Sequence, residues 1–288
     1  MLDFTLEFDR FRLKLGPCAC IMGILNATPD SFSDGGQYHT LETALTQGRT
    51  LAKAGAHILD IGGESSRPFA QAVSEQEELD RVIPVIETLA REIDIPISID
   101  TVKSRVARAA LDAGATIIND ISAFEKDPAM VDIAAEKKVP CVLMHMKGTP
   151  ETMQVKPNYE DLMAEITTYL DSRAQFARGR GIARDNIILD PGIGFGKTIE
   201  HNLVILNHLH KICDLGYPVL MGPSRKSFIQ AILNKQETNP VGPDNIKTEY
   251  GTLAAVAASI LKGAHIVRVH DVEKIISFTR ILDAIRHA

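Results

Sequence analysis

Eight short apolar segments, rich in β-branched residues, recur along the chain and are separated by longer segments with helical periodicity. The apolar segments cover residues 18–26, 57–63, 95–101, 115–120, 140–145, 186–192, 218–224 and 264–270. Each is nearly continuous in apolar residues rather than alternating, which is typical of parallel strands buried on both faces. The segments between them predict helices over residues 41–54, 75–93, 103–113, 128–138, 159–180, 202–215, 250–262 and 272–288. Eight such units in about 250 residues predict a closed (β/α)8 TIM barrel, with an open doubly wound sheet as the alternative.

The residues before the first apolar segment have a different pattern. Apolar and polar residues alternate over residues 4–15, which predicts a short N-terminal β-hairpin. We expect this hairpin to plug the N-terminal end of the barrel. The chain contains no linker rich in proline or serine, so we predict a single domain over residues 1–288.

Composition narrows the class of protein. The formal net charge of −6 does not suit a general nucleic-acid binder, which needs a basic surface. The apolar segments are much shorter than the roughly 18 residues that a membrane span requires, so we expect no membrane association. Four cysteines are too few for a disulfide framework, and the first residues carry acids early, unlike a signal peptide. These features favour the reducing environment of the cytoplasm.

Polar residues stand at the carboxyl end of every predicted strand. They are Asn26, residues 64–67, Asp100, residues 119–120, His145, Asp190, residues 224–226, Arg268 and His270. In barrels of this class the active site lies at the carboxyl ends of the strands. Buried polar groups are costly unless they are paired, so a ligand with many hydrogen-bonding groups would account for them. Salt bridges or helix caps could account for any one of them alone.

These strand ends indicate two kinds of binding site. The first is rich in hydrogen-bond acceptors, which are supplied by Asp100, Asn119 and Asp190, and it suits a flat heterocycle with amino and N–H donors. Lys226 could reach a ring carbonyl or ring nitrogen of the same heterocycle.

The second site is cationic. Arg268 and His270 are two residues apart on one strand, so their side chains share a face. Together with Asn26 and Ser66 they suit a phosphate or pyrophosphate. The Asn26 carbonyl oxygen could bind Mg²⁺ directly or through a water molecule.

The glycine-rich segment ILDPGIGFGK at residues 188–197 is not a nucleotide-binding motif. It lacks the spacing of the Walker A loop, and the position required for the last glycine of G-x-G-x-x-G is a lysine. We expect its glycines to let a tight loop pass close over a flat ligand, with Phe195 projecting as an apolar wall.

Motifs along the whole chain resemble those of the dihydropteroate synthase family. They are IMGILNATPDSFSDGG (21–36), DIGGESSRP (60–68), SIDT (98–101), IND (118–120), MHMKGTPETMQ (144–154), ILDPGIGFGK (188–197), GPSRKSFI (222–229) and RVHDV (268–272). The resemblance implies a (β/α)8 barrel that condenses 6-hydroxymethyl-7,8-dihydropterin pyrophosphate with p-aminobenzoate. The products would be 7,8-dihydropteroate and pyrophosphate. The alternative is a methyltetrahydrofolate–corrinoid methyltransferase, which has no pyrophosphate to bind, so its pyrophosphate site would be idle. A pterin-binding module without catalysis is a further alternative, and we would expect its pyrophosphate site to be incomplete.

The resemblance also assigns roles to individual residues. The pterin would contact Asp100, Asn119, Met144, Asp190, Gly222, Lys226 and Arg268. The pyrophosphate would contact Asn26, Ser66, Arg268 and His270, with Mg²⁺ at Asn26, and p-aminobenzoate would contact Arg67, Pro68, Phe195, Ser224 and Lys226. The catalytic set would be Asp100, Asp190, Lys226, Arg268 and His270. No nucleophile–base pair is evident, which favours a dissociative reaction in which pyrophosphate leaves first.

The resemblance further implies a homodimer and binding of sulfonamide inhibitors. Two positions depart from the family pattern: Ser66 replaces a usual threonine, and Phe69 replaces a usual glycine. Because Phe69 would add bulk near the p-aminobenzoate entrance, the sequence does not determine the sensitivity to sulfonamides.

Overall fold

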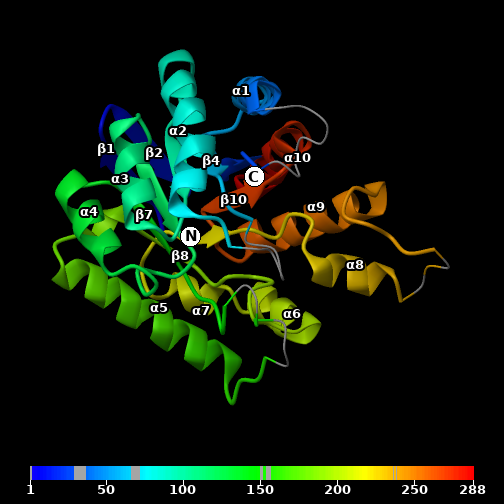
Figure 1. Cartoon of the computed structure of the whole chain (residues 1–288). Helices are drawn as coiled ribbons and strands as arrows, with labels where there is room; N and C mark the ends of the chain where they lie inside the picture. Colours follow the sequence, from blue (N-terminus) through cyan, green and yellow to red (C-terminus); the bar gives the residue numbers. More distant parts are fainter. Residues whose placement is uncertain are drawn as a thin grey trace.

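Eight parallel strands surround the centre of the molecule in the computed structural model, which describes residues 2–28, 37–65, 72–149, 152–153, 157–235, 237 and 239–288 (Figure 1). The strands are β3 (Cys20–Asn26), β4 (Ile58–Gly62), β5 (Ile97–Asp100), β6 (Ile117–Asp120), β7 (Cys141–Met144), β8 (Ile187–Asp190), β9 (Leu220–Met221) and β10 (Ile266–Val269). Their order is β8-β7-β6-β5-β4-β3-β10-β9. A parallel bridge between Leu189 and Val219 joins the two ends. The sheet is therefore a closed barrel, as predicted, and not an open sheet.

Helices cover the outside of this barrel (Figure 1). They are α1 (Gln37–Lys53), α2 (Glu75–Glu92), α3 (Ser104–Asp112), α4 (Ala129–Lys137), α5 (Leu162–Gly179), α6 (Ile199–Asn207), α7 (His210–Cys213), α8 (Ser227–Leu233), α9 (Ile246–Leu261) and α10 (Val272–Arg286). In α2, Val82, Val85, Ile86 and Leu89 are buried, as the helical period requires. In the described part of the chain, no helix is both long and apolar enough to cross a membrane.

Two helices differ from the sequence-based expectation. The single helix predicted over residues 202–215 is divided into α6 and α7, because the backbone leaves the helical conformation at His208 (φ −111°, ψ 23°). Helix α8 was not predicted at all. With seven residues it spans only about two turns, which is too short to give a periodic apolar pattern.

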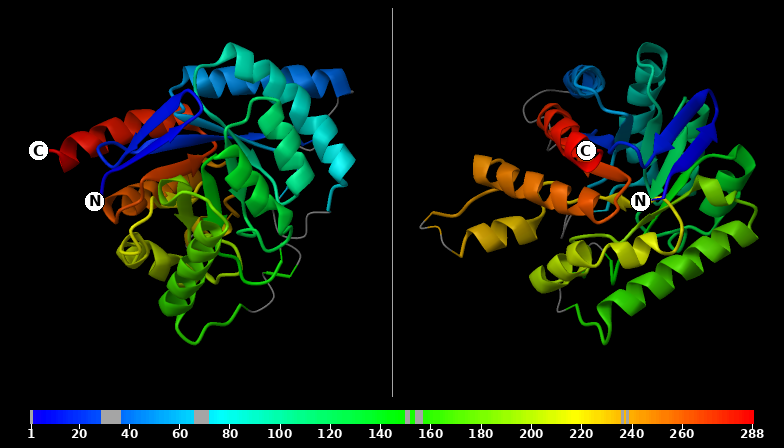
Figure 2. Two further views of the ribbon diagram at one scale, coloured as in Figure 1. Left: turned by 90° about the vertical axis from the view of Figure 1, so that its left-hand side faces the viewer. Right: turned by 180° about the vertical axis from the view of Figure 1, so that it is seen from behind.

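The N-terminal hairpin closes one end of the barrel, as predicted. Strands β1 (Phe4–Phe8) and β2 (Phe11–Leu15) pair in antiparallel fashion. Leu6, Phe8 and Leu15 are buried against an apolar layer inside the barrel that is formed by Cys20, Met22, Ile58, Ile117, Val142, Ile188, Leu220 and Ile266. Both chain termini lie at this end (Figure 2). The other end of the barrel is therefore the one that can receive a ligand.

The barrel interior changes from apolar to polar over two residues along each strand. Side chains two residues apart on a strand point to the same face. The residues two positions beyond the apolar layer are Ile24, Asp60, Asn119, Met144, Asp190, Gly222 and Arg268. Most of these are polar or leave room for a ligand. The period of the strands thus places an acceptor-rich layer directly above the apolar layer that the hairpin seals.

Candidate active site

A single pocket at the carboxyl end of the barrel brings together residues from separate strands. Its volume is about 360 Å³, including the space at its open mouth. It is lined by Asp100, Asn119, Ile121, Met144, Asp190, Ile193, Phe195, Gly222, Lys226 and Arg268. All residues that the sequence resemblance associates with a pterin lie in this lining. Five of the polar strand-end residues therefore meet at one cavity, whereas Asn26, Ser224 and His270 are not in its lining.

Arg268 is the central cation of the pocket floor. Its Nε donates to Asp60 Oδ2 at 2.6 Å and its Nη2 donates to Asp100 Oδ2 at 2.7 Å. Asp60 Oδ2 also accepts from Asn119 Nδ2 at 3.1 Å. The arginine and asparagine therefore hold one another in place through a shared carboxylate.

Burial changes the protonation of the two acids that line the pocket. It raises the pKa of Asp100 to about 7, although the Arg268 charge opposes this shift. Burial likewise raises the pKa of Asp190 to about 6, opposed by the hydrogen bond that Asp190 Oδ1 accepts from the Gly192 N–H at 2.7 Å. A ligand that donates hydrogen bonds to these two acids would favour their ionised forms and so lower both pKa values.

Lys226 and Phe195 form one side of the pocket. The Lys226 Nζ lies 4.0 Å from the centroid of the Phe195 ring, a cation–π contact. Burial lowers the pKa of Lys226 to about 8, and the Arg268 charge lowers it further. The residue before it, Arg225, has a positive φ of 56°, and its side chain binds Glu249 and Asp244 on the outside of the barrel. This backbone turn directs Lys226 inward and Arg225 outward.

Ser224, His270 and Asn26 lie at neighbouring strand ends. Ser224 Oγ is 3.0 Å from His270 Nδ1 and accepts from the His270 N–H at 3.3 Å. Asn26 ends β3, which pairs with β10, the strand that precedes His270. In register, Asn26 pairs with Gly62 and Gly62 with Asp100, so Asn26 belongs to the row of side chains that includes Asp100. Ser66, Arg67, Pro68 and Phe69 lie outside the described residues.

The glycines after Asp190 allow two loops to touch. Gly192 has φ 67°, and a Cβ at this position would lie 2.0 Å from the His145 carbonyl oxygen. Gly196 has φ 64°, and a Cβ there would lie 2.3 Å from the Lys147 carbonyl oxygen. The close approach at Gly192 and Gly196 is to the backbone of residues 145–147. Ile193 and Phe195 of the same loop line the pocket, so the loop forms part of its wall.

The sequence of this chain is similar to those of known pterin-binding enzymes. Residues 22–270 match the model of a family described as pterin binding enzyme. A dihydropteroate synthase from Synechocystis sp. is 49% identical over 265 residues, which cover 92% of this chain and 89% of that protein. The chain belongs to the dihydropteroate synthase family of pterin-binding enzymes.

Solved structures of the dihydropteroate synthase family have the same fold. The Yersinia pestis enzyme in complex with a sulfonamide drug superposes with a TM-score of 0.91 at 42% identity, covering 99% of this chain and 100% of that one. The Xanthomonas albilineans enzyme with 4-aminobenzoic acid has a TM-score of 0.90 at 42% identity, and both chains are covered fully. The (β/α)8 barrel and the family are thereby established together.

Two residues next to the pocket of this dihydropteroate synthase family member were missed by sequence reasoning. Asp60 is fully buried within β4, and its second oxygen, Oδ1, has no hydrogen-bond partner among the described residues. The sequence feature that could have revealed Asp60 is an acid in the middle of the apolar strand at residues 58–62, rather than at the end of that strand. Lys197 is 3% exposed and lies at the end of the glycine-rich loop. The sequence feature that could have revealed Lys197 is a lysine directly after the last glycine of this loop, where no nucleotide-binding motif accounts for it.

Proposed function

We propose that this chain condenses 6-hydroxymethyl-7,8-dihydropterin pyrophosphate with p-aminobenzoate, giving 7,8-dihydropteroate and pyrophosphate. The observation that carries the assignment is the single pocket in which Asp100, Asn119 and Asp190 meet Lys226 and Arg268. Several acceptors and two cations around one cavity suit a pterin, a flat ring system whose edge presents amino and N–H donors together with a ring carbonyl.

The pocket suits a reaction in which pyrophosphate leaves before the amine attacks. As the bond between the pterin methylene and oxygen breaks, positive charge develops on the pterin. Asp100 and Asp190 in their ionised forms would stabilise that charge within a largely buried site. An arylamine is already neutral at pH 7, so its attack requires no strong base. This agrees with the lack of a nucleophile–base pair among the residues that line the pocket.

The second substrate would bind beside the pterin, at the mouth of the pocket. Phe195 offers an apolar wall, and Lys226 offers a cation next to it. We assign Ser224, Arg67 and Pro68 to the same site from the family resemblance. The Xanthomonas relative was solved with 4-aminobenzoic acid and the Yersinia relative with a sulfonamide, which supports binding of both compounds by the present chain.

The pyrophosphate and Mg²⁺ are assigned to the end of the barrel near β3 and β10. His270 is joined to Ser224, and Asn26 ends the neighbouring strand. The described residues contain no group of three or more His, Cys, Asp or Glu side chains that could hold a metal ion. That suits Mg²⁺ bound with a phosphorylated substrate, because Mg²⁺ keeps several water ligands and needs few protein oxygens. Asn26 would supply one, and the ion would offset negative charge on the leaving group.

The reaction is tested by measuring pyrophosphate release from the pterin pyrophosphate. We expect release that depends on p-aminobenzoate, forms 7,8-dihydropteroate in equal amount, and is lost when EDTA removes Mg²⁺ and restored when Mg²⁺ is added. A binding module would take up the pterin without release. Methyl transfer from methyltetrahydrofolate to a corrinoid, with no condensation, would support the alternative function. Release unaffected by EDTA would reject only the assignment of Mg²⁺.

We propose that a second copy of the chain covers α9 and α10. Large apolar residues are exposed on both helices: Ile246, Tyr250, Leu261, Ile281 and Ile285, at 52–67%. The two helices pack against each other, so these residues can form one surface (Figure 1). Exposed apolar surfaces of this kind mark interaction sites, and two-fold dimers are the commonest assembly of identical chains.

The dimer is tested by sedimentation velocity. We expect the wild type to sediment as a dimer, and Tyr250→Glu combined with Ile281→Glu to sediment as a folded monomer. Leu203→Glu is the control, because Leu203 is an exposed apolar residue on α6 and its substitution should leave the dimer intact. A wild type that is monomeric at micromolar concentration, or a double variant that remains dimeric, would contradict this surface.

A further inference from the structure

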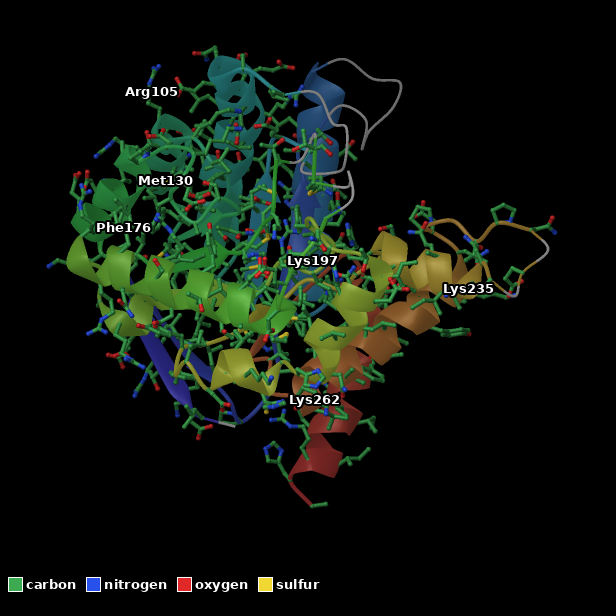
Figure 3. All side chains as sticks on the ribbon, turned by 90° about the horizontal axis from the view of Figure 1, so that it is seen from below. Arg105, Met130, Phe176, Lys197, Lys235 and Lys262 are labelled. Atoms are coloured by element: carbon green, nitrogen blue, oxygen red, sulfur yellow. The ribbon has the colours of Figure 1, made fainter. Side chains whose placement is uncertain are left out.

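A buried lysine lies directly behind the Phe195 wall. Lys197 Nζ donates to the Phe195 carbonyl oxygen at 2.9 Å and to the His145 carbonyl oxygen at 3.2 Å, and it lies 3.0 Å from His145 Nδ1. It therefore joins the loop after β8 to the end of β7. Figure 3 places Lys197 near the middle of the molecule, whereas the labelled Lys235 and Lys262 lie toward its outside.

The three partners of Lys197 carry no charge. Burial lowers the pKa of His145 to about 3, and the Lys197 charge lowers it further, so this imidazole is neutral at physiological pH and its Nδ1 can accept. An ammonium group has three donors, and here it has three acceptors. Hydrogen bonding is thus satisfied, while no carboxylate among the described residues contacts the positive charge, which is unusual for a group that is 3% exposed.

Other contacts leave the glycine-rich loop little freedom. The Tyr159 hydroxyl donates to the Gly196 carbonyl oxygen at 2.7 Å, and the Gly194 N–H donates to Asn202 Oδ1 at 2.7 Å. With Gly192 and Gly196 packed against residues 145–147, the main chain around Phe195 is held on both sides. The bond from Lys197 Nζ to the Phe195 carbonyl oxygen adds a contact from a charged group to this main chain.

Lys197 is joined to Asp190 through His145, because the His145 N–H donates to the Asp190 carbonyl oxygen at 2.9 Å and Lys197 Nζ binds His145. Burial lowers the pKa of Lys197 to about 7, and the Asp190 carboxylate opposes this shift. Reciprocally, the pKa of Asp190 is raised by burial and lowered by its hydrogen bond with Gly192 and by the charges of Lys226, Lys197 and Arg268. Around Lys197 itself, the titratable groups are His145, Asp190 and Lys226, with Lys147 and His201 farther out.

We propose that Lys197 is a positioning residue for the pterin and p-aminobenzoate sites: its ammonium group holds the main chain of Phe195 and supplies a buried positive charge beside Asp190. This inference rests on the proposed function, because it assigns substrates to the pocket that Phe195 and Asp190 line. Lys197 does not touch substrate. It acts through the residues that do.

The two parts of this role can be separated by two variants. Lys197→Met removes both the charge and the donor, whereas Lys197→Gln removes the charge but can still donate to a carbonyl oxygen. Lys147→Met is the matched control, because Lys147 is a neighbouring lysine whose Nζ binds Glu165 at 2.9 Å on the surface. Circular dichroism and thermal melting would first establish that each variant is folded.

Calorimetric titration with the pterin pyrophosphate from pH 5 to 8 measures how the charge of Lys197 changes the affinity for this substrate. Asp190 must be ionised to accept, so affinity falls as pH decreases through its pKa. Without the Lys197 charge that pKa rises, so both variants should move the midpoint of this fall to higher pH. Near pH 5, below both pKa values, their affinity should be about tenfold below that of the wild type, the effect of about one pKa unit, and near pH 6.5 about threefold below it. Only Lys197→Met should also raise KM for p-aminobenzoate.

Each outcome decides one question. An unshifted midpoint in both Lys197 variants, or an equal shift in Lys147→Met, would overturn the role proposed for the charge. An unchanged KM for p-aminobenzoate in Lys197→Met would overturn the role proposed for the wall. If neither variant folds, Lys197 serves the barrel itself and the positioning role is rejected. A wild type that does not bind the pterin pyrophosphate would instead reject the proposed function.

Discussion

Replacing Asp190 with asparagine is expected to reduce the affinity for the pterin pyrophosphate by about 10- to 100-fold. Asparagine has nearly the same shape and can still accept from the Gly192 N–H, so the loop should keep its conformation. It has only one acceptor oxygen and no charge. A hydrogen bond to a charged group contributes about 1.5–3 kcal/mol, and about 3 kcal/mol corresponds to a hundredfold in affinity. Isothermal titration calorimetry measures this loss directly, and Asp190→Ala should abolish binding.

The pH dependence of the wild type tests the same assignment. The pKa of Asp190 is raised to about 6 by burial, above its ordinary value, so the carboxylate that accepts from the pterin is present above this pH and is lost below it. We therefore expect pterin affinity to decrease as pH falls from 7 to 5, and we expect a smaller decrease in Asp190→Asn, in which only Asp100 of the two acids still titrates.

Two variants serve as controls for Asp190. Asp185→Asn changes an exposed acid just before β8, at the opposite end of the barrel from the pocket, and should leave affinity unchanged. His270→Ala should weaken binding of the pterin pyrophosphate far more than binding of the unphosphorylated pterin alcohol, because we assign His270 to the pyrophosphate. If Asp190→Asn binds the pterin as tightly as the wild type does, the pterin does not contact this residue.

Replacing Arg268 with methionine is expected to cost about 3–5 kcal/mol of folding free energy, besides abolishing turnover. Removing one partner of a buried ion pair leaves the other charge uncompensated, and losses of this size are typical. Here two acids lose their partner, and Asp60 is fully buried with Oδ1 already unpaired among the described residues. Equilibrium unfolding in urea measures the change.

A double-mutant cycle identifies the cause. In the background of Asp60→Asn the side chain at position 60 is neutral but can still accept from Asn119, so Arg268→Met should cost much less than it does alone. Arg49→Met is the control, because Arg49 pairs with Glu92 on the surface and its loss should change stability far less. Equal losses for Arg268→Met with and without Asp60→Asn would mean that lost packing, not the uncompensated acid, dominates.

The pocket also explains why a pterin enzyme can do without a nucleophile. Its polar groups come from the ends of several strands of a rigid barrel and are held by one another, as Asp60, Asn119 and Arg268 are. Such groups need no rearrangement when charge develops on the substrate, which is the basis of electrostatic stabilisation. Both Arg268→Met and Lys197→Met test this preorganisation, one from the floor of the pocket and one from behind its wall.

The chain's own amino-acid order was enough to predict the barrel and most of the pocket. Continuous apolar runs separated by helical segments are typical of a parallel sheet that is buried on both faces, and eight of them suit a closed ring. Since active sites of such barrels lie at the carboxyl ends of the strands, reading the strand ends identified Asp100, Asn119, Asp190 and Arg268. Helix α8 was not predicted, because a segment of seven residues has too few turns to show a period.

Only the tertiary structure shows which of these residues form hydrogen bonds and ion pairs with one another. Asp60 and Arg268 are separated by 208 residues, and they meet because ring closure places β10 beside β3 and turns both side chains into the barrel. Likewise, Lys197 binds His145 because glycines allow two loops to approach within contact of each other's backbone. Local periodicity is a property of neighbouring residues and can be read along the chain. Pairing across a closed barrel depends on register and on the inward faces of distant strands, which no local pattern contains.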